Sequence, residues 1–161
     1  MKILLYGYGN PGRQDDGLGA EFVDRMEAWV KKEKINEVYF DSNYQLNIED
    51  AHEISDKEVV IFVDASVEEV DDFCVTRVDA KKDVTFTSHA ASPGYIYALC
   101  EEVFGKAPLT YLMHIRGYEW EFREGLTDKA VQNMEKALDY CQQRIKDPEK
   151  LINPDKFLKS C

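Results

Sequence analysis

Short apolar runs alternate along this chain with longer segments in which apolar residues recur at helical spacing. The run at 59–63 is continuously apolar and leads into Asp64, which is typical of a central parallel strand buried on both faces. Residues 73–78 alternate between polar and apolar side chains, as in an edge or antiparallel strand. Together these runs predict strands over residues 3–6, 38–41, 59–64, 73–78 and 109–116.

The segments between these runs have the pattern of helices. In residues 18–34, apolar side chains recur on one helical face. Ser92 is suited to cap a helix that continues to residue 104, with Pro93 in its first turn. The predicted helices cover residues 18–34, 47–54, 93–104 and 127–145, and residues 147–161 are expected to form a polar tail.

This order predicts an α/β fold. We expect a three-layer α/β/α sandwich of the phosphorylase/hydrolase-like kind, with a mixed, mostly parallel sheet of about five strands. One hydrolase-like domain would span residues 1–146, followed by the tail at 147–161. Ligands of such sheets bind where the parallel strands end, so the residues just past those ends are the ones to inspect.

Composition narrows the classes of function. The chain has 161 residues and a formal net charge of −11, which disfavours nucleic acid as a partner. No apolar run has the length of a membrane span, and Met1 leads almost directly into the first strand. We therefore expect a cytoplasmic protein without a membrane partner. The four cysteines lack paired spacing, so free thiols are expected at Cys74, Cys100, Cys141 and Cys161.

Two aspartates and one histidine are the main candidates for chemistry. Asp16 and Asp64 each follow a predicted strand, and His89 follows a short apolar segment at 84–86. These three side chains can converge at one edge of the sheet. Two carboxylates and one imidazole suit a divalent ion such as nickel, zinc or manganese.

The glycines of the first loop allow two other interpretations. The stretch GYGNPG at 7–12 fits the dinucleotide fingerprint GxGxxG, with Asp41 at the end of the second strand. However, Pro11 has no N–H to donate, and the acids at 15–16 would repel a pyrophosphate. The same stretch resembles the opening of peptidyl-tRNA hydrolases, but no histidine follows within 13–19, where that family has its catalytic histidine.

A third resemblance covers essentially the whole predicted domain. The stretches GYGN at 7–10, DDGLG at 15–19, VDA at 63–65 and SH at 88–89 together resemble the hydrogenase maturation endopeptidases. Members of that family remove a C-terminal extension from the large subunit of nickel–iron hydrogenases after nickel has been loaded. The resemblance implies that Asp16, Asp64 and His89 contact this nickel and are the catalytic residues.

Further expectations follow from this resemblance. The Ni²⁺ would belong to the precursor large subunit, which is the expected partner, although other divalent ions could occupy the site. Asp15 is a candidate for a supporting role, and the amides of Gly9 and Asn10 are candidates to polarise the scissile carbonyl. Two other functions stay open: a peptidyl-tRNA hydrolase-like enzyme, and a non-catalytic chaperone that binds the hydrogenase precursor or nickel.

Three other residues of reactive type have simpler interpretations. His52 and His114 have no neighbour in the sequence at metal-ligand spacing, and His114 is expected within a strand. Cys100 lies among apolar residues of a predicted helix, which indicates a core position.

Overall fold

The computed structural model describes residues 1–80 and 91–161. Its twelve elements, in chain order, are β1 (Ile3–Tyr8), η1 (Gln14–Gly17), α1 (Leu18–Glu33), β2 (Val38–Asn43), α2 (Asp50–Ile54), β3 (Val59–Ser66), β4 (Phe73–Val78), α3 (Pro93–Phe104), β5 (Leu109–Arg116), α4 (Asp128–Lys146), α5 (Glu149–Ile152) and α6 (Pro154–Phe157). Among the described residues, no helix combines the length and the apolar character needed to cross a membrane.

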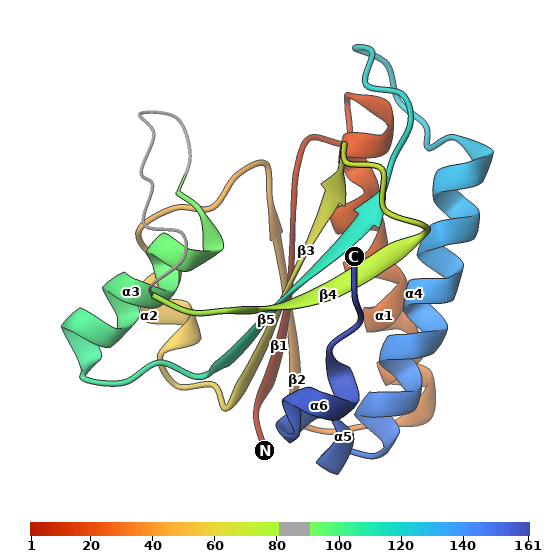
Figure 1. Cartoon of the computed structure of the whole chain (residues 1–161). Helices are drawn as coiled ribbons and strands as arrows, with labels where there is room; N and C mark the ends of the chain where they lie inside the picture. The colour runs from red at the N-terminus through yellow and green to blue at the C-terminus, as the bar shows by residue number, and fades with distance from the viewer. Residues whose placement is uncertain (81–90) are drawn as a thin grey trace.

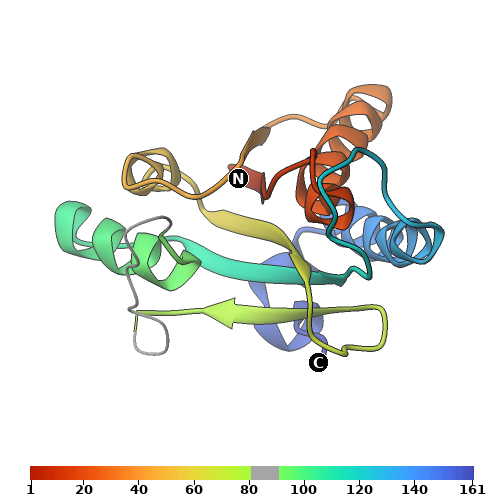
Figure 2. The same cartoon turned by 90° about the horizontal axis from the view of Figure 1, so that it is seen from above.

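The five strands form one mixed sheet in the order β2-β1-β3-β5-β4. Four strands run parallel, and β4 pairs antiparallel with β5 at one edge. Helices α1 and α4 cover one face, whereas α2 and α3 cover the other (Figures 1 and 2). The predicted three-layer α/β/α sandwich with a mostly parallel sheet is confirmed.

Alternation along the strands divides the core into two parts. Leu5, Ile61 and Met113 point toward α1 and α4, whereas Leu4 and Phe62 point toward α2 and α3. In β3 every residue from 59 to 63 is buried, as its continuous apolar run predicts. Both faces of the sheet are therefore closed by helices, and polar groups gather where the strands end.

The segment that was expected to be a polar tail is ordered against the domain. Residues 147–161 form α5 and α6 and bury Leu151 and Phe157 in the larger core. The Tyr111 hydroxyl donates to the Leu151 carbonyl at 2.6 Å, and the two rings of Tyr111 and Phe157 meet edge to face. A few apolar residues are enough for this packing. The prediction missed them because it was based on the mostly polar composition of the whole segment.

Candidate functional site

Three glycines let the start of α1 lie directly on the ends of β1 and β3. A Cβ atom on Gly7 would be 2.1 Å from the Gly19 carbonyl oxygen, and one on Gly19 would be 2.6 Å from that of Val63. Both distances are impossible for any larger residue. Gly9 has a positive φ of 132°, and a Cβ there would meet the Asp16 backbone oxygen at 2.2 Å. The glycine pattern therefore serves close backbone packing, which brings η1 next to β3.

Asp16 and Asp64 meet at this point, as the sequence predicts. Asp16 lies in η1, and its Oδ2 accepts a hydrogen bond from the Asn10 amide at 2.8 Å. Asp64 is in β3, whose pairing continues two residues beyond the predicted end of the strand. Burial, and then the negative charge of Asp16, raise the pKa of Asp64 to about 7. Hydrogen bonds from the Ala65 amide and the Tyr8 hydroxyl oppose this rise without cancelling it.

The third predicted member, His89, lies outside the described residues, as does the apolar segment at 84–86. Its place relative to Asp16 and Asp64 stays a prediction. The connection that precedes it leaves β4, the strand at the edge of the sheet.

Asp15 does not have the supporting chemical role that was expected of it. Its carboxylate is fully buried and accepts four hydrogen bonds: from the amides of Tyr118, Glu119 and Thr127 at 2.7–3.1 Å and from the Thr127 hydroxyl at 2.8 Å. Three of these bonds end on Oδ2 and one on Oδ1, and together they hold the connection after β5 against η1. Asp15 is therefore a structural residue.

The expected role of the Gly9 and Asn10 amides is also wrong. The Gly9 amide donates to the Asn43 carbonyl at 3.1 Å, and the Asn10 amide to Asp16. Gly12 and Arg13 donate in turn to the side-chain and backbone oxygens of Asn10. These amides are occupied within the protein, so they offer no cradle for an oxyanion or for a pyrophosphate. This geometry also argues against dinucleotide binding.

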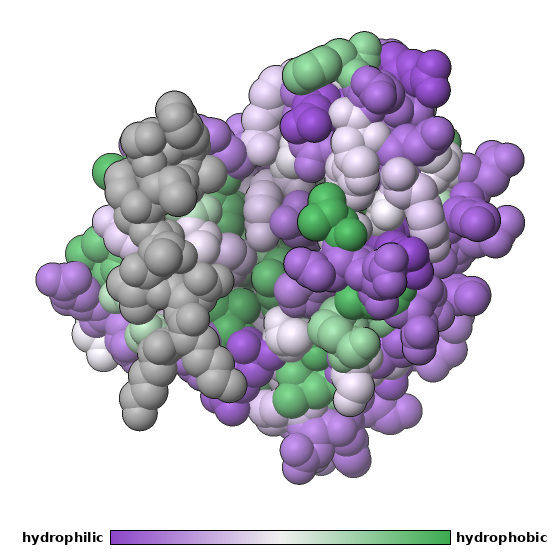
Figure 3. All heavy atoms as spheres, turned by 45° about the horizontal axis from the view of Figure 1, so that its top comes forward, coloured by the Kyte–Doolittle hydropathy of each residue, from purple (hydrophilic) through white to green (hydrophobic). Residues whose placement is uncertain are grey.

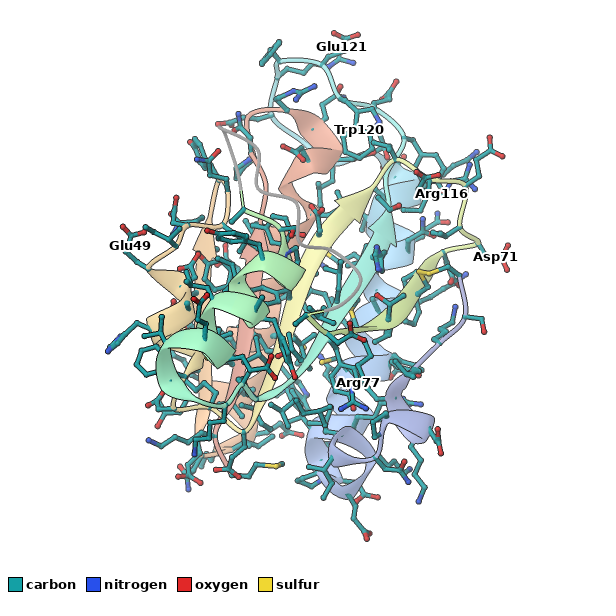
Figure 4. The ribbon with its side chains drawn as sticks, turned by 60° about the vertical axis from the view of Figure 1, so that its left-hand side comes forward. Glu49, Asp71, Arg77, Arg116, Trp120 and Glu121 are labelled. Atoms are coloured by element: carbon teal, nitrogen blue, oxygen red, sulfur yellow. A yellow bond between two sulfur atoms is a disulfide. The ribbon has the colours of Figure 1, made fainter. Side chains whose placement is uncertain are left out.

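The connection after β5 forms a rim beside the two aspartates. Trp120 and Glu121 lie on this connection, which projects beyond the sheet, and Arg116 lies at the end of β5 (Figure 4). The Arg13 guanidinium donates to the Trp120 carbonyl at 3.2–3.3 Å and lies 5.0 Å from the centre of the Phe122 ring. Figure 3, in which this end comes forward, shows apolar side chains among polar ones across the exposed face.

A second group of acids, which the sequence did not single out, lies beside the end of β2. Oxygens of Asp41, Asp50 and Glu53 are all within 4.8 Å of one another. Asp50 accepts hydrogen bonds from the Tyr6 hydroxyl at 2.9 Å and from the Asn47 amide at 2.8 Å. Burial, together with a hydrogen bond to Asp41 and its charge, raises the pKa of Glu53 to about 8. Near neutral pH, the Glu53 carboxyl is therefore protonated, and its O–H donates a hydrogen bond to Asp41.

The cysteines differ from the expectation of four free thiols. Cys74 and Cys161 form a disulfide, whereas Cys100 and Cys141 are free and buried. Cys161 approaches β4 because α5 and α6 turn the chain back along the sheet edge. The two cysteines are 87 positions apart in the sequence, so no local sequence pattern reveals this pairing.

His114 lies in β5, as predicted, and folding brings two cysteines that are distant in the sequence close to it. It is register partner to both Asp64 of β3 and Cys74 of β4. A ring nitrogen of His114 and the sulfurs of Cys74 and Cys161 lie within 4.8 Å of one another. Burial lowers the pKa of this imidazole, and its Nε2 is 2.9 Å from the Thr76 hydroxyl.

Comparisons with known proteins identify the fold. No protein-family model and no curated protein sequence matches the chain. Among solved structures, it is similar to the NiFe hydrogenase maturation protease HycI from Thermococcus kodakarensis, with a TM-score of 0.72, 18% identity, and coverage of 91% of this chain and 93% of that chain. The hydrogenase maturating endopeptidase HybD from E. coli matches with a TM-score of 0.71 and 18% identity over 92% and 94% of the two chains. The chain therefore has the fold of these proteases.

Proposed function

We propose that this protein is an endopeptidase that removes the C-terminal extension of a nickel-loaded NiFe-hydrogenase large subunit. Three findings support the proposal. The fold is that of hydrogenase maturation proteases along nine-tenths of the chain. Asp16 and Asp64 come together at the end of the sheet where such folds bind ligands. Close backbone packing at the glycines of the first loop brings Asp16 next to β3.

The observation that carries the proposal is the mutual repulsion of these two carboxylates. Asp64 is partly buried beside a second negative charge, and it has few donors to offset that charge. A divalent cation between the two carboxylates would remove the repulsion and displace the proton that Asp64 otherwise holds. Two such oxygens together with an imidazole form a suitable ligand set for nickel.

In this proposal Asp16, Asp64 and His89 bind the nickel that the precursor carries, so the metal is part of the substrate. The protease would thereby recognise a loaded precursor and hold the scissile peptide close to a Lewis acid. Positioning of this kind lowers the barrier to attack by water, which adds its hydroxyl to the carbonyl carbon and a proton to the leaving amine. Nickel dependence of the cleavage is part of the proposal.

The surface around the pair suits a protein substrate. Tyr44, Val67 and Phe122 lie on the connections after β2, β3 and β5, and each is more than two-thirds exposed. Apolar side chains exposed on neighbouring connections are typical of surfaces that bind other proteins. The precursor large subunit is the partner that we propose for this surface.

The decisive experiment separates the protease from the non-catalytic chaperone. The protein is incubated with a nickel-loaded precursor, and the mass of the large subunit is followed by mass spectrometry. A shortened large subunit supports the protease. An unchanged mass in a stable complex supports the chaperone and rejects the protease.

Variants of the three predicted ligands then test the site. Asp16→Asn, Asp64→Asn and His89→Ala should each slow processing strongly. Asp139→Asn is the matched control, because Asp139 is exposed on α4 and its carboxylate accepts a surface hydrogen bond from Gln143. Processing at the wild-type rate by all three ligand variants would show that the chemistry lies elsewhere.

A further inference from the structure

We propose that reduction of the Cys74–Cys161 disulfide opens a zinc site made of these two thiolates and the His114 imidazole. The three side chains come from β4, β5 and the segment after α6, and their ligand atoms already lie within 4.8 Å of one another. In a tetrahedral site with Zn–S bonds of about 2.3 Å, two sulfurs are about 3.8 Å apart. The backbone therefore needs only small adjustments once the sulfur–sulfur bond has opened.

The surroundings keep Cys161 beside Cys74 without help from the disulfide. Lys159 pairs with Val75 through two backbone hydrogen bonds of 3.0 and 3.1 Å, and its ammonium binds the Asp72 carboxylate at 3.1 Å. The Tyr140 hydroxyl donates to the Phe157 carbonyl at 2.8 Å, while the Phe157 ring is buried. After reduction, these contacts keep the two thiols close together. The segment that carries Cys161 therefore loses little conformational entropy when a metal binds.

His114 has the outer contact that metal-binding histidines usually make. Its Nε2 is 2.9 Å from the Thr76 hydroxyl, and this contact orients the imidazole ring. His114 and Cys161 also line a cavity of about 630 Å³ that runs along β4. This cavity gives an ion a path to the site and leaves room for water as a fourth ligand.

The reaction balances with a dithiol as the reductant. Two electrons pass from the dithiol to the Cys74–Cys161 bond, so the reductant becomes a disulfide and the protein gains two thiols. Cys161 is exposed, so its sulfur is the one open to attack. Zn²⁺ then displaces one proton from each thiol, and the complex of one zinc, two thiolates and a neutral imidazole has no net charge.

The test uses the full chain and the metal alone. The protein is reduced with a dithiol, desalted without oxygen and titrated with Zn²⁺ against a chromophoric chelator, and Co²⁺ serves as the spectroscopic probe. We expect the reduced chain to bind one zinc more than the oxidised chain, and to show a thiolate-to-cobalt charge-transfer band that the oxidised chain lacks. Reduced protein without this band would overturn the proposal.

Matched variants locate the bound ion. Cys161→Ser and His114→Gln should each weaken zinc binding at least tenfold, whereas Cys100→Ala and His52→Gln should bind as the wild type does. Asp64→Asn should leave the cobalt band unchanged, which separates this site from the carboxylates of the proposed peptidase. Circular dichroism checks that each variant is folded. Full zinc affinity in reduced Cys161→Ser would also reject the site.

Discussion

Asp15 and Asp16 are neighbours in η1, but the surroundings of their carboxylates differ in hydrogen-bond donors and in nearby charge. The Asp15 carboxylate is fully buried and surrounded by donors from the connection after β5. Within residues 1–80 and 91–161, Asp16 accepts a hydrogen bond from the Asn10 amide and lies close to a second carboxylate. A saturated carboxylate stabilises the fold, whereas one that is repelled and sparsely bonded is available to a ligand. The hydrogen-bond partners of an acid thus reveal its role better than its position in a motif.

The largest effect should come from removing the structural member of this comparison. Asp15→Ala leaves the amides of Tyr118, Glu119 and Thr127 without their acceptor, which should cost about 3–4 kcal/mol of unfolding free energy. Urea denaturation measures this loss, and Asp139→Ala is the exposed control. A loss below about 1 kcal/mol would mean that Asp15 does not organise this region.

A substitution of Asp64, a proposed metal ligand, should instead lower activity without lowering stability. Asp64→Asn should lower the rate of precursor processing at least ~100-fold, equivalent to about 2.7 kcal/mol of barrier. Stability at pH 7 should stay equal or increase, because the substitution removes a buried charge that Asp16 repels. The measurements are single-turnover processing by mass spectrometry and urea unfolding. Loss of stability in parallel with activity would assign Asp64 to the structural class instead.

The repulsion itself can be measured through pH. The pKa of Asp64 in the folded state, about 7, lies above its ordinary value of 3.8, so the unfolded chain releases this proton first. The contribution of Asp64 to stability therefore falls as pH rises from about 4 to about 7. Between pH 6 and 7 the fall should be about 1 kcal/mol relative to Asp64→Asn. In Asp16→Asn, carbon-detected NMR titration should give a lower pKa for Asp64, and an unchanged value would show that the two charges do not interact.

The smallest effect should come from the second group of acids. Glu53 is already protonated at neutral pH, and its O–H donates a hydrogen bond to Asp41. The amide of Glu53→Gln keeps a hydrogen-bond donor at the same place. Stability at pH 7 should change by less than about 1 kcal/mol, and processing should be unaffected. Urea unfolding and the processing assay test both points. A large loss of processing in this variant would move the functional centre toward β2.

The fold could be predicted from the sequence because its signals are local. The buried run of β3 and the caps of the helices each depend on a few neighbouring residues; for example, the Ser92 side chain accepts from the Tyr95 amide at 3.1 Å. The convergence of Asp16 and Asp64 could also be predicted, because parallel strands end at the same edge of a sheet. Periodicity and topology together thus provide the architecture and two of the three residues of the proposed ligand set.

The contacts that fix Asp15, Cys74 and the Gly9 amide join distant parts of the chain. Asp15 bonds to residues more than 100 positions away, and Cys74 pairs with a cysteine 87 positions away. The role of the Gly9 amide is decided by the Asn43 carbonyl on β2. No local pattern specifies such partners, because they depend on how finished elements pack. The structure also shows which backbone atoms the glycines of the first loop make room for.

The segment after α6 also protects the sheet from other chains. β4 is an edge strand that pairs with β5 on one side only, so its outer N–H and C=O groups are a template for aggregation. Lys159 pairs with Val75 along that edge and adds a charged side chain there. The outer edge of β4 therefore stays open to pairing until the segment around Lys159 has folded onto it. The same short segment that holds Cys161 in place thus determines when the edge of β4 is no longer open to pairing with another chain.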